Sequence, residues 1–345
     1  MKYLIKITPL EPYTFGTDQN IRYPGEEPTG KETYFVDSGE VPEQTTIFGL
    51  IRYMILEHSG VLDADFNYDG KEDLISNLIG ENSFSFNGSG GFNFGKIRKV
   101  SPLFLMNDSG EYLVRNPLNN KSPEGYRPFE LEEEAVTTSF GKIRMPKAGE
   151  YNPKEGLQTG YINLTTKKVE NALFQHIVST RIRTEDKEDD DNFFKVRSVE
   201  LKKGFSFAVF AETDGELLSE RTICYMGRGK SAFLVESMPH DNDLEDSVKA
   251  CFQEGEPCYY ALSDLYPGSN FKLDTFSIIR DKRIRNLMTR YRKAPYLRKI
   301  NKSPAQFYLV GAGSVFYGHE PAITKDAYYL NAGYNSLIKI GGSTK

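Results

Sequence analysis

The sequence predicts an α+β protein with two domains, and three observations lead to this expectation. The chain has 345 residues and a mass of 39.1 kDa, which is enough for two domains of ordinary size. Residues 41–60 show helical periodicity, whereas several shorter stretches alternate apolar and polar side chains as strands do. Hydrophobic residues make up 39% of the chain and aromatic residues 13%, so each domain has the material for a buried core.

Composition excludes several classes of function. The formal net charge is −5, so the chain is not a globally basic nucleic-acid binder, and any such site must come from a local cluster. The three cysteines (Cys224, Cys251 and Cys258) are too few and too far apart for a disulfide framework or a zinc site. No apolar run is long enough to span a membrane, and the first ten residues lack a signal-peptide layout. We therefore expect a cytoplasmic protein with reduced thiols, no metal or other cofactor and no membrane contact.

The stretch VPEQTTIFGLIRYMILEHSG, residues 41–60, predicts the best-defined helix. Thr45 or Thr46 can cap its first N–H groups, and Ser59 with Gly60 can end it. The apolar residues that recur at helical spacing, and therefore form its core face, are Ile47, Ile51 and Ile55.

A second stripe of this helix carries different chemistry. Thr45, Gly49 and Arg52 follow one another at steps of four and three residues. Gly49 would admit a partner backbone, and Arg52 would add a charged fork beside it. Together with Thr46 at the helix start, this combination suits a phosphate. The plainer interpretation is a buried helix whose glycine packs on a strand and whose arginine meets a carboxylate.

Strands are expected on both sides of this helix. Residues 1–10 predict the first strand, because Tyr3, Ile5 and Ile7 alternate with other side chains. A long polar loop is then expected over residues 17–43. Further strands are predicted at residues 161–164, 173–182, 195–201, 205–211 and 258–265.

Two segments have unusual composition. Residues 82–95, NSFSFNGSGGFNFG, predict either a hairpin with a flexible tip or a Gly-Phe platform on which bases stack. Residues 130–160 have few core residues and predict a projecting hairpin or mobile loop, with Lys142 and Arg144 close to Met145.

The most basic part of the chain, residues 280–302, holds ten Lys or Arg residues against a single acid, Asp281. An apolar seam predicts a helix there, which Pro295 stops, and its residues are Ile284, Leu287, Met288 and Tyr291. Such a helix would present a row of cations to a polyanion, among them Arg283, Arg285, Arg290 and Arg292. The alternative is an ordinary solvated amphipathic helix.

Two glycine-rich turns offer further phosphate contacts. The turn in MGRGKS, residues 226–231, lacks the glycine spacing of a P-loop but places Arg228 and Lys230 beside it. In VGAGSVFY, residues 310–317, a strand is interrupted at Gly311, Gly313 and Ser314, and exposed amides there would bind phosphate.

Five segments together carry a family resemblance: PLEPYTFG (9–16), TTIFGLIRYMI (45–55), MGRGKSAFLVE (226–236), YYALSDLYPG (259–268) and VGAGSVFY (310–317). Their order resembles the RAMP proteins of CRISPR effectors, most of all the third RAMP subunit of the Cmr (type III-B) complex. The family's middle motif usually reads Gly-Gly-Glu, where this chain has Met226-Gly227-Arg228, and its usual Trp-containing segment is replaced by the basic stretch. The equivalent type III-A subunit therefore stays open.

The resemblance implies two ferredoxin-like (RRM-like) domains with loop and hairpin insertions, residues 1–165 and 166–345, the second carrying the basic insert 280–302. It implies a non-catalytic subunit that holds the 5′ handle of the CRISPR RNA and meets target RNA only indirectly. Its protein partners would be the large polymerase-like subunit and the backbone RAMP subunits.

The resemblance also implies roles for particular residues. Those that would approach the handle phosphates or line the same cleft are Thr46, Gly49, Arg52, Gly311, Gly313 and Ser314, with Arg228 and Lys230 nearby. The residues that would wedge the RNA near the handle–guide junction are Lys142, Arg144 and Met145.

Two other classes of function remain open from the sequence. A metal-free RNA-processing endonuclease of the same superfamily needs a general base and acid, and His58 and His319 would have to meet in the fold. A purely structural assembly protein would need no RNA contact at all.

Overall fold

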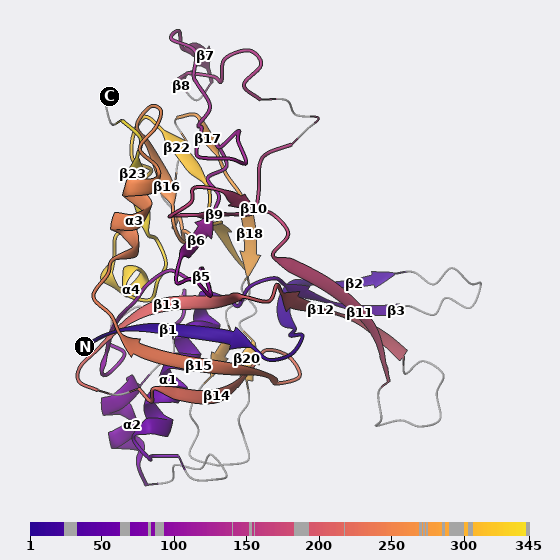
Figure 1. Ribbon diagram of the computed structural model, residues 1–345, viewed down its shortest axis with the longest axis vertical. Coiled ribbons are helices and arrows are strands. Elements are labelled where there is room, and N and C mark those ends of the chain that lie inside the picture. Colours follow the sequence, from indigo (N-terminus) through magenta and orange to yellow (C-terminus); the bar gives the residue numbers. More distant parts are fainter. Residues whose placement is uncertain are drawn as a thin grey trace.

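The computed structural model describes residues 1–23, 33–62, 70–81, 84–86, 93–139, 141–151, 154, 156–182, 193–216, 218–268, 271, 273, 275–284, 287–289, 300–302 and 306–342. It combines helices with several antiparallel sheets, as the α+β prediction requires. Figure 1 shows a body built around one large sheet, with a sheet arm projecting from its side and a small hairpin at one end.

The large sheet has nine strands, and β1 (Lys2–Pro9) lies near its middle. β1 pairs antiparallel with both of its neighbours, and Ile5 and Ile7 are fully buried. The other strands, in order across the sheet, are β10 (Val169–Glu170), β9 (Tyr161–Asn163), β6 (Tyr112–Arg115), β5 (Phe104–Asn107) and β13 (Phe205–Thr213) on one side of β1, and β15 (Ser231–Pro239) and β14 (Arg221–Met226) on the other, while β4 (Ile97–Val100) also pairs with β13. Strands from both sides of residue 165 therefore share this sheet.

The helix α1 (Gln44–His58) follows the predicted periodicity. Ile47, Ile51 and Ile55 are fully buried, which confirms the predicted core face. Glu43, rather than Thr45 or Thr46, occupies the N-cap position, so the predicted cap is wrong. The chain runs from β1 through α1 and, after a long excursion, to β14. Because β15 is antiparallel to both strands, β1 and β14 run parallel.

A smaller antiparallel sheet lies above the first in Figure 1. Its strands are β17 (Ser277–Ile278), β22 (Val315–Tyr317), β16 (Cys258–Ala261) and β23 (Leu337–Ile340). The helix α3 (Leu244–Cys251) covers it through Val248 and Cys251, which share a core with Tyr260 and Ile338. The two remaining helices are α2 (Glu72–Ile79), which packs on α1, and α4 (Ala327–Leu330).

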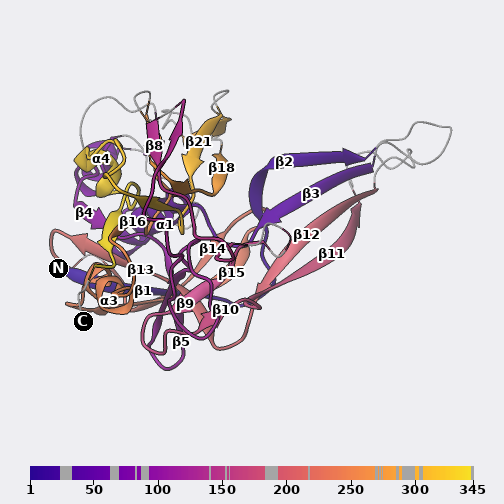
Figure 2. The same cartoon turned by 90° about the horizontal axis from the view of Figure 1, so that it is seen from above.

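Four strands form the arm, which projects away from the body in both views (Figures 1 and 2). They are β11 (Phe174–Ile182), β12 (Phe193–Leu201), β3 (Thr33–Gly39) and β2 (Phe15–Tyr23). The prediction of a long polar loop over residues 17–43 is therefore wrong. β3 pairs antiparallel with β2 and parallel with β12, which is far along the chain, and Arg197 on β12 pairs with Asp37 on β3 at 2.9 Å. A local sequence pattern does not register such pairing.

The prediction of a helix in the basic stretch is also wrong. The chain there forms β18 (Asp281–Ile284), which pairs with β21 (Phe307–Val310), and β19 (Leu287–Thr289), which pairs with β20 (Ile300–Lys302). A helix would have stacked like charges three and four residues apart, which destabilises it, whereas the described strands pair with β21 and β20.

The phenylalanines of the Gly-Phe segment that the structure describes do not form the base-stacking platform that the sequence suggested. Phe84, Phe86 and Phe94 are each 3% exposed, inside an aromatic cluster with Tyr328 and Tyr334. Edge-to-face and offset ring contacts of this kind stabilise a core. These three rings therefore pack between α1 and the last helix region of the chain.

Candidate nucleic-acid interface

A cleft of about 560 Å³ lies where the start of α1 meets β18 and the turn that follows β21. It is assembled from segments that are far apart in the sequence. The charged and aromatic side chains that line it are Glu40, Glu43, Phe104, Arg115, Tyr161, Asp264, Arg280, Asp281, Lys282, Arg283 and Tyr334. Acids and bases are thus mixed in its wall, and the pairing between them decides which charges are left for a ligand.

Lys282 is neutralised by two acids. Its Nζ lies 2.6 Å from Asp264 Oδ2 and 2.8 Å from Glu43 Oε2, and Asp264 Oδ1 accepts a hydrogen bond from the amide of Ala312 at 3.0 Å. Burial opposes ionisation of Asp264, but the charge of Lys282 and these hydrogen bonds outweigh it and hold the pKa of Asp264 below its ordinary value. Burial likewise opposes the charge of Lys282, yet the two acids raise its pKa. These three side chains therefore form a structural ion-pair network at the start of α1.

Arg280 and Arg115 are in a different situation. The Arg115 guanidinium stacks 4.3 Å from the Tyr161 ring centre, and its nearest acid, Glu40, is 3.7 Å away. Arg280 is half-buried, and in the described part of the chain its guanidinium has neither an ion pair nor a hydrogen bond. Burial and the neighbouring charge of Arg115 lower the pKa of Arg280. A half-buried cation beside a second cation and without a directly paired acid is costly, so these two guanidiniums are a candidate site for an anion.

The Gly311–Ser314 turn holds Arg280 in place. The Arg280 amide donates to Ser314 Oγ at 3.0 Å, and the Gly311 amide donates to the Arg280 carbonyl at 2.7 Å. A Cβ at Gly311 would come within 3.1 Å of Arg280 Cδ, so the glycine lets this side chain lie across the backbone.

The amides of this turn are not exposed, which corrects the prediction that they would bind phosphate directly. The Gly313 amide donates to the Ala261 carbonyl at 2.8 Å, and Ser314 is fully buried. The turn is therefore at the predicted cleft, but its geometry supports the cleft's cations.

The predicted stripe of α1 does not line the cleft, although the residues just before it do. Glu43 and Gln44 line it, whereas Thr46 is half-buried just beyond and Gly49 is exposed, with open space where a side chain would be. Arg52 is 5% exposed, and its charge acts on the buried hydroxyl of Tyr328. Arg52 is thus directed into the core, whereas Gly49 on the same stripe is exposed.

Only part of the predicted basic row can be placed. Arg283 lines the cleft, pairs with Asp281 at 3.5 Å and lies 5.2 Å from the ring centre of Tyr308, which is 54% exposed. Arg285, Arg290 and Arg292 lie outside the described residues. Arg228 and Lys230 lie at the tip of the β14–β15 hairpin and are not part of the cleft wall.

The projecting hairpin expected over residues 130–160 is present as β7 (Val136–Thr138) and β8 (Gly141–Ile143), at the top of Figure 1. Lys142 is exposed and Met145 is 45% exposed. Arg144 instead forms a two-pronged ion pair with Glu256, at 2.7 and 2.9 Å. It therefore fastens the hairpin to the body.

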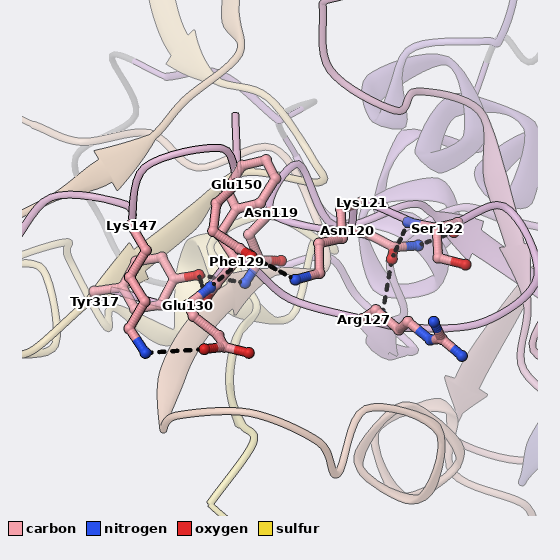
Figure 3. Close-up of polar contacts among 10 residues, drawn as sticks. All are labelled: Asn119, Asn120, Lys121, Ser122, Arg127, Phe129, Glu130, Lys147, Glu150 and Tyr317. Atoms are coloured by element: carbon pink, nitrogen blue, oxygen red, sulfur yellow. Dashed lines mark hydrogen bonds and ion pairs between the residues drawn. The ribbon is translucent and has the colours of Figure 1, made fainter. Parts of the chain in front are cut away.

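A polar network anchors the chain on both sides of this hairpin (Figure 3). Lys121 contacts Glu150 at 2.7 Å, and Lys147 contacts Glu130 at 3.0 Å. At its buried end, Asn119 Nδ2 donates to the hydroxyl of Tyr317 at 2.8 Å. The base of the hairpin is therefore fixed, although the segment contains few core residues.

We expect Asn119→Ala to lower the free energy of unfolding by about 1–3 kcal/mol, because it leaves the buried hydroxyl groups that Asn119 contacts without their hydrogen-bond partner. Asn119 is fully buried and also lies 3.3 Å from the hydroxyl of Tyr126. Urea titration would measure the loss. Ser122→Ala is the matched control, since its hydroxyl serves only an exposed turn amide, and it should change stability by less than about 0.5 kcal/mol. Equal effects of the two would contradict this account.

Sequence reasoning missed Arg115 and Tyr161 entirely and counted Arg280 only as one of a basic row. Arg115 ends a strand whose preceding residues, Leu113 and Val114, are buried. A charged residue closing an apolar strand was the one local signal available.

The two histidines proposed for catalysis do not meet. His58 ends α1 and contacts Ser219 at 3.4 Å, while His319 follows β22, which lies at the other end of the body (Figure 1). Among the described residues, no cluster of His, Cys, Asp or Glu is arranged to hold a metal, and no helix is long and apolar enough to cross a membrane. The three cysteines are free and buried.

Comparison with known proteins agrees with the motif order. The family model described as CRISPR-associated protein (Cas_Cmr3) matches residues 6–259. No curated protein matches the chain significantly. Among solved structures, the chain is similar to one in the type III-B Cmr-beta complex bound to cognate target RNA, with 15% identity over 99% of this chain and 98% of the other and a TM-score of 0.49. It is also similar to one in the Csm3–Csm4 subcomplex of the type III-A interference complex, with 12% identity over 100% of both chains and a TM-score of 0.37.

The family model covers well over half of the chain, from within β1 to the second residue of β16. This range takes in the segments PLEPYTFG, TTIFGLIRYMI and MGRGKSAFLVE that first suggested the relationship. The protein belongs to the Cas_Cmr3 family of CRISPR-associated proteins.

Proposed function

We propose that this protein is a non-catalytic RNA-binding subunit of a type III CRISPR effector complex, and that its cleft holds the 5′ handle of the CRISPR RNA. The observation that carries the proposal is the guanidinium of Arg280, which faces the cleft beside Arg115 without an acid partner among the described residues. An RNA phosphate supplies the missing anion, and the exposed Tyr308, beside Arg283 of the cleft wall, offers an aromatic face.

The body of the protein is proposed to contain two ferredoxin-like units. In the first, β1, α1 and the β15–β14 hairpin form a split β-α-β arrangement, with β15 between two parallel strands. In the second, α3 covers the antiparallel sheet of β16, β22 and β23. The predicted boundary at residue 165 would then fall inside an excursion of the chain that returns to the first sheet.

The protein partners follow from family membership. We expect the large polymerase-like subunit and the backbone RAMP subunits to bind this protein, and target RNA to be met only through the CRISPR RNA. The β7–β8 hairpin, with Lys142 and Met145 exposed, is the proposed wedge near the handle–guide junction, and Arg144 would hold it in position through Glu256.

The test is to purify the tagged protein from its own host and to sequence the RNA that accompanies it. Short RNAs with one constant 5′ end, found together with RAMP proteins and a large polymerase-like protein, are the expected result. Recovery of the protein free of RNA and of these partners would contradict the proposal. A repeat-RNA cleavage assay on the same material, with a His58→Ala, His319→Ala variant, would detect the endonuclease alternative.

A further inference from the structure

A second group of cations lies where the arm passes the tip of the β14–β15 hairpin. The group consists of Arg181 on β11 and of Arg228 and Lys230 in the hairpin turn, and all three are exposed. Arg228 and Lys230 flank Gly229, and a Cβ on Gly229 would lie 3.7 Å from Arg181 Nη1. Residues almost fifty positions apart in the sequence are thus brought to one place.

The turn that carries these cations is held rigidly. The Arg228 amide donates to the Thr14 carbonyl at 2.8 Å. Gly227 has a φ of 75°, and a Cβ there would lie 2.6 Å from the same carbonyl, so only glycine lets the hairpin dock on the base of the arm. The spacing between the cations of the hairpin and of the arm is therefore set by the backbone.

The three cations have no ion-pair partner among the residues that the structure describes. Glu11, an acid on the adjoining segment, accepts a hydrogen bond from the amide of Ala232 at 2.8 Å and forms no ion pair with the described cations of the group. In a protein with a net charge of −5, three unpaired cations at one point form a local positive field.

The group also lies close to one end of the cleft, with the buried residues Thr14 and Phe15 between them along the backbone. Thr14 and Phe15, which receive the hairpin tip, are followed at once by Gly16, which lines the cleft. Two residues of extended chain span roughly 7 Å, so a polymer that leaves the cleft past Gly16 reaches the cations within about one or two of its repeating units.

We propose that Arg181, Arg228 and Lys230 form a second phosphate contact, which grips the single-stranded RNA that extends from the cleft. This inference rests on the proposed function, because the RNA must first occupy the cleft. It assigns a role in RNA binding to the arm, through Arg181, and it divides the RNA contact into a cleft part and a hairpin–arm part.

The experiment compares two single-stranded RNAs with the same 5′ sequence, one just long enough to fill the cleft and one about twelve nucleotides longer. Fluorescence anisotropy would give their affinities for the full chain as a function of salt. The variant Arg181→Gln, Arg228→Gln, Lys230→Gln should bind the longer RNA about tenfold or more weakly and the shorter RNA within about twofold of wild type. Its slope of log affinity against log salt for the longer RNA should fall by about 2, since each phosphate contact on a single strand contributes about 0.7.

Matched variants separate this site from general charge and from the cleft. Lys99→Gln, Lys203→Gln, Lys339→Gln makes the same change in net charge at exposed positions elsewhere and should leave both affinities unchanged. Arg280→Gln, in the cleft, should weaken both RNAs. Each of the three single variants of the group should lower the slope by about 0.7, which keeps the test valid should the triple variant fold poorly.

The outcomes are distinguishable. Unchanged binding of the longer RNA by the triple variant overturns this inference alone, and would leave an acidic protein surface as the occupant of the group. An equal loss with the lysine control overturns it too, since net charge then explains the effect. If the wild-type chain binds neither RNA, the proposed function fails and this inference fails with it.

Discussion

Replacing Arg280 with glutamine is expected to weaken RNA binding by about 30-fold, or about 2 kcal/mol, without destabilising the free protein. The two expectations have one cause. In the described structure the Arg280 guanidinium has no acid partner, and Arg115 repels it, which together with burial lowers the pKa of Arg280. A ligand phosphate relieves that repulsion, so the arginine contributes to binding while it costs stability in the unbound state.

Two measurements check this pair of expectations. Anisotropy titration with a short handle RNA gives the affinity, and urea unfolding of the RNA-free protein gives the stability. Arg127→Gln is the matched control, because Arg127 is exposed, its side chain points away from the polar network around it (Figure 3), and it lies outside the cleft. A clear loss of stability with Arg280→Gln would mean that Arg280 is a structural residue, and unchanged affinity would remove it from the RNA site.

The elements that the sequence predicted correctly are those with a local cause. The alternation of Tyr3, Ile5 and Ile7 and the helical spacing of Ile47, Ile51 and Ile55 each describe one buried face, and burial confirmed both. A pattern of this kind depends only on neighbours within the same element.

The errors arise where a distant partner decides the conformation. The apolar seam of residues 284–291 fits a helix, yet pairing with Phe307–Val310 makes β18 a strand. The stretch that forms β3 was predicted as part of a polar loop, although it begins with the strand-favouring residues Thr33 to Val36, and it pairs both with β2 and with β12, about 160 residues later. Pairing over such separations is not encoded in periodicity.

The prediction of the cleft from the sequence has the same limit, because contacts between distant segments decide which charges are paired. The sequence pointed to the right neighbourhoods, since the start of α1, the basic stretch and the Gly311–Ser314 turn all meet there. It did not separate the neutralised Lys282 from the unpaired Arg280, because that difference depends on Asp264 and Glu43, which come from two other segments.

Replacing Lys282 with methionine is expected to lower the free energy of unfolding by about 3 kcal/mol, the lower end of the range for breaking a buried ion pair. The lower end applies because 26% of the Lys282 side chain remains exposed. The loss comes from Asp264 and Glu43, which would stay in a mostly buried site without their cation. Urea unfolding at neutral pH would measure it. Lys325→Met breaks an ion pair on a side chain that is 67% exposed and should cost less than about 1 kcal/mol.

The pH dependence of the free energy of unfolding provides a second, independent test of this prediction. In the wild type the pKa of Asp264 is below its ordinary value, so its contribution to stability is present at neutral pH and is lost as the pH falls below about 4. Without Lys282, burial dominates and the pKa of Asp264 should rise above its unfolded value. The native state of the variant then binds the proton more tightly than the unfolded state, so the stability lost at pH 7 should be partly regained towards pH 5.

Adding Asp264→Asn to the Lys282→Met variant should restore most of the lost stability at pH 7 and remove the gain at low pH. Asparagine keeps an oxygen that accepts from the amide of Ala312, but it carries no charge for the site to bury. Additive losses in the double variant, or a Lys282→Met protein whose stability falls on acidification as the wild type's does, would contradict the pairing of Lys282 with Asp264 as the source of stability at the start of α1.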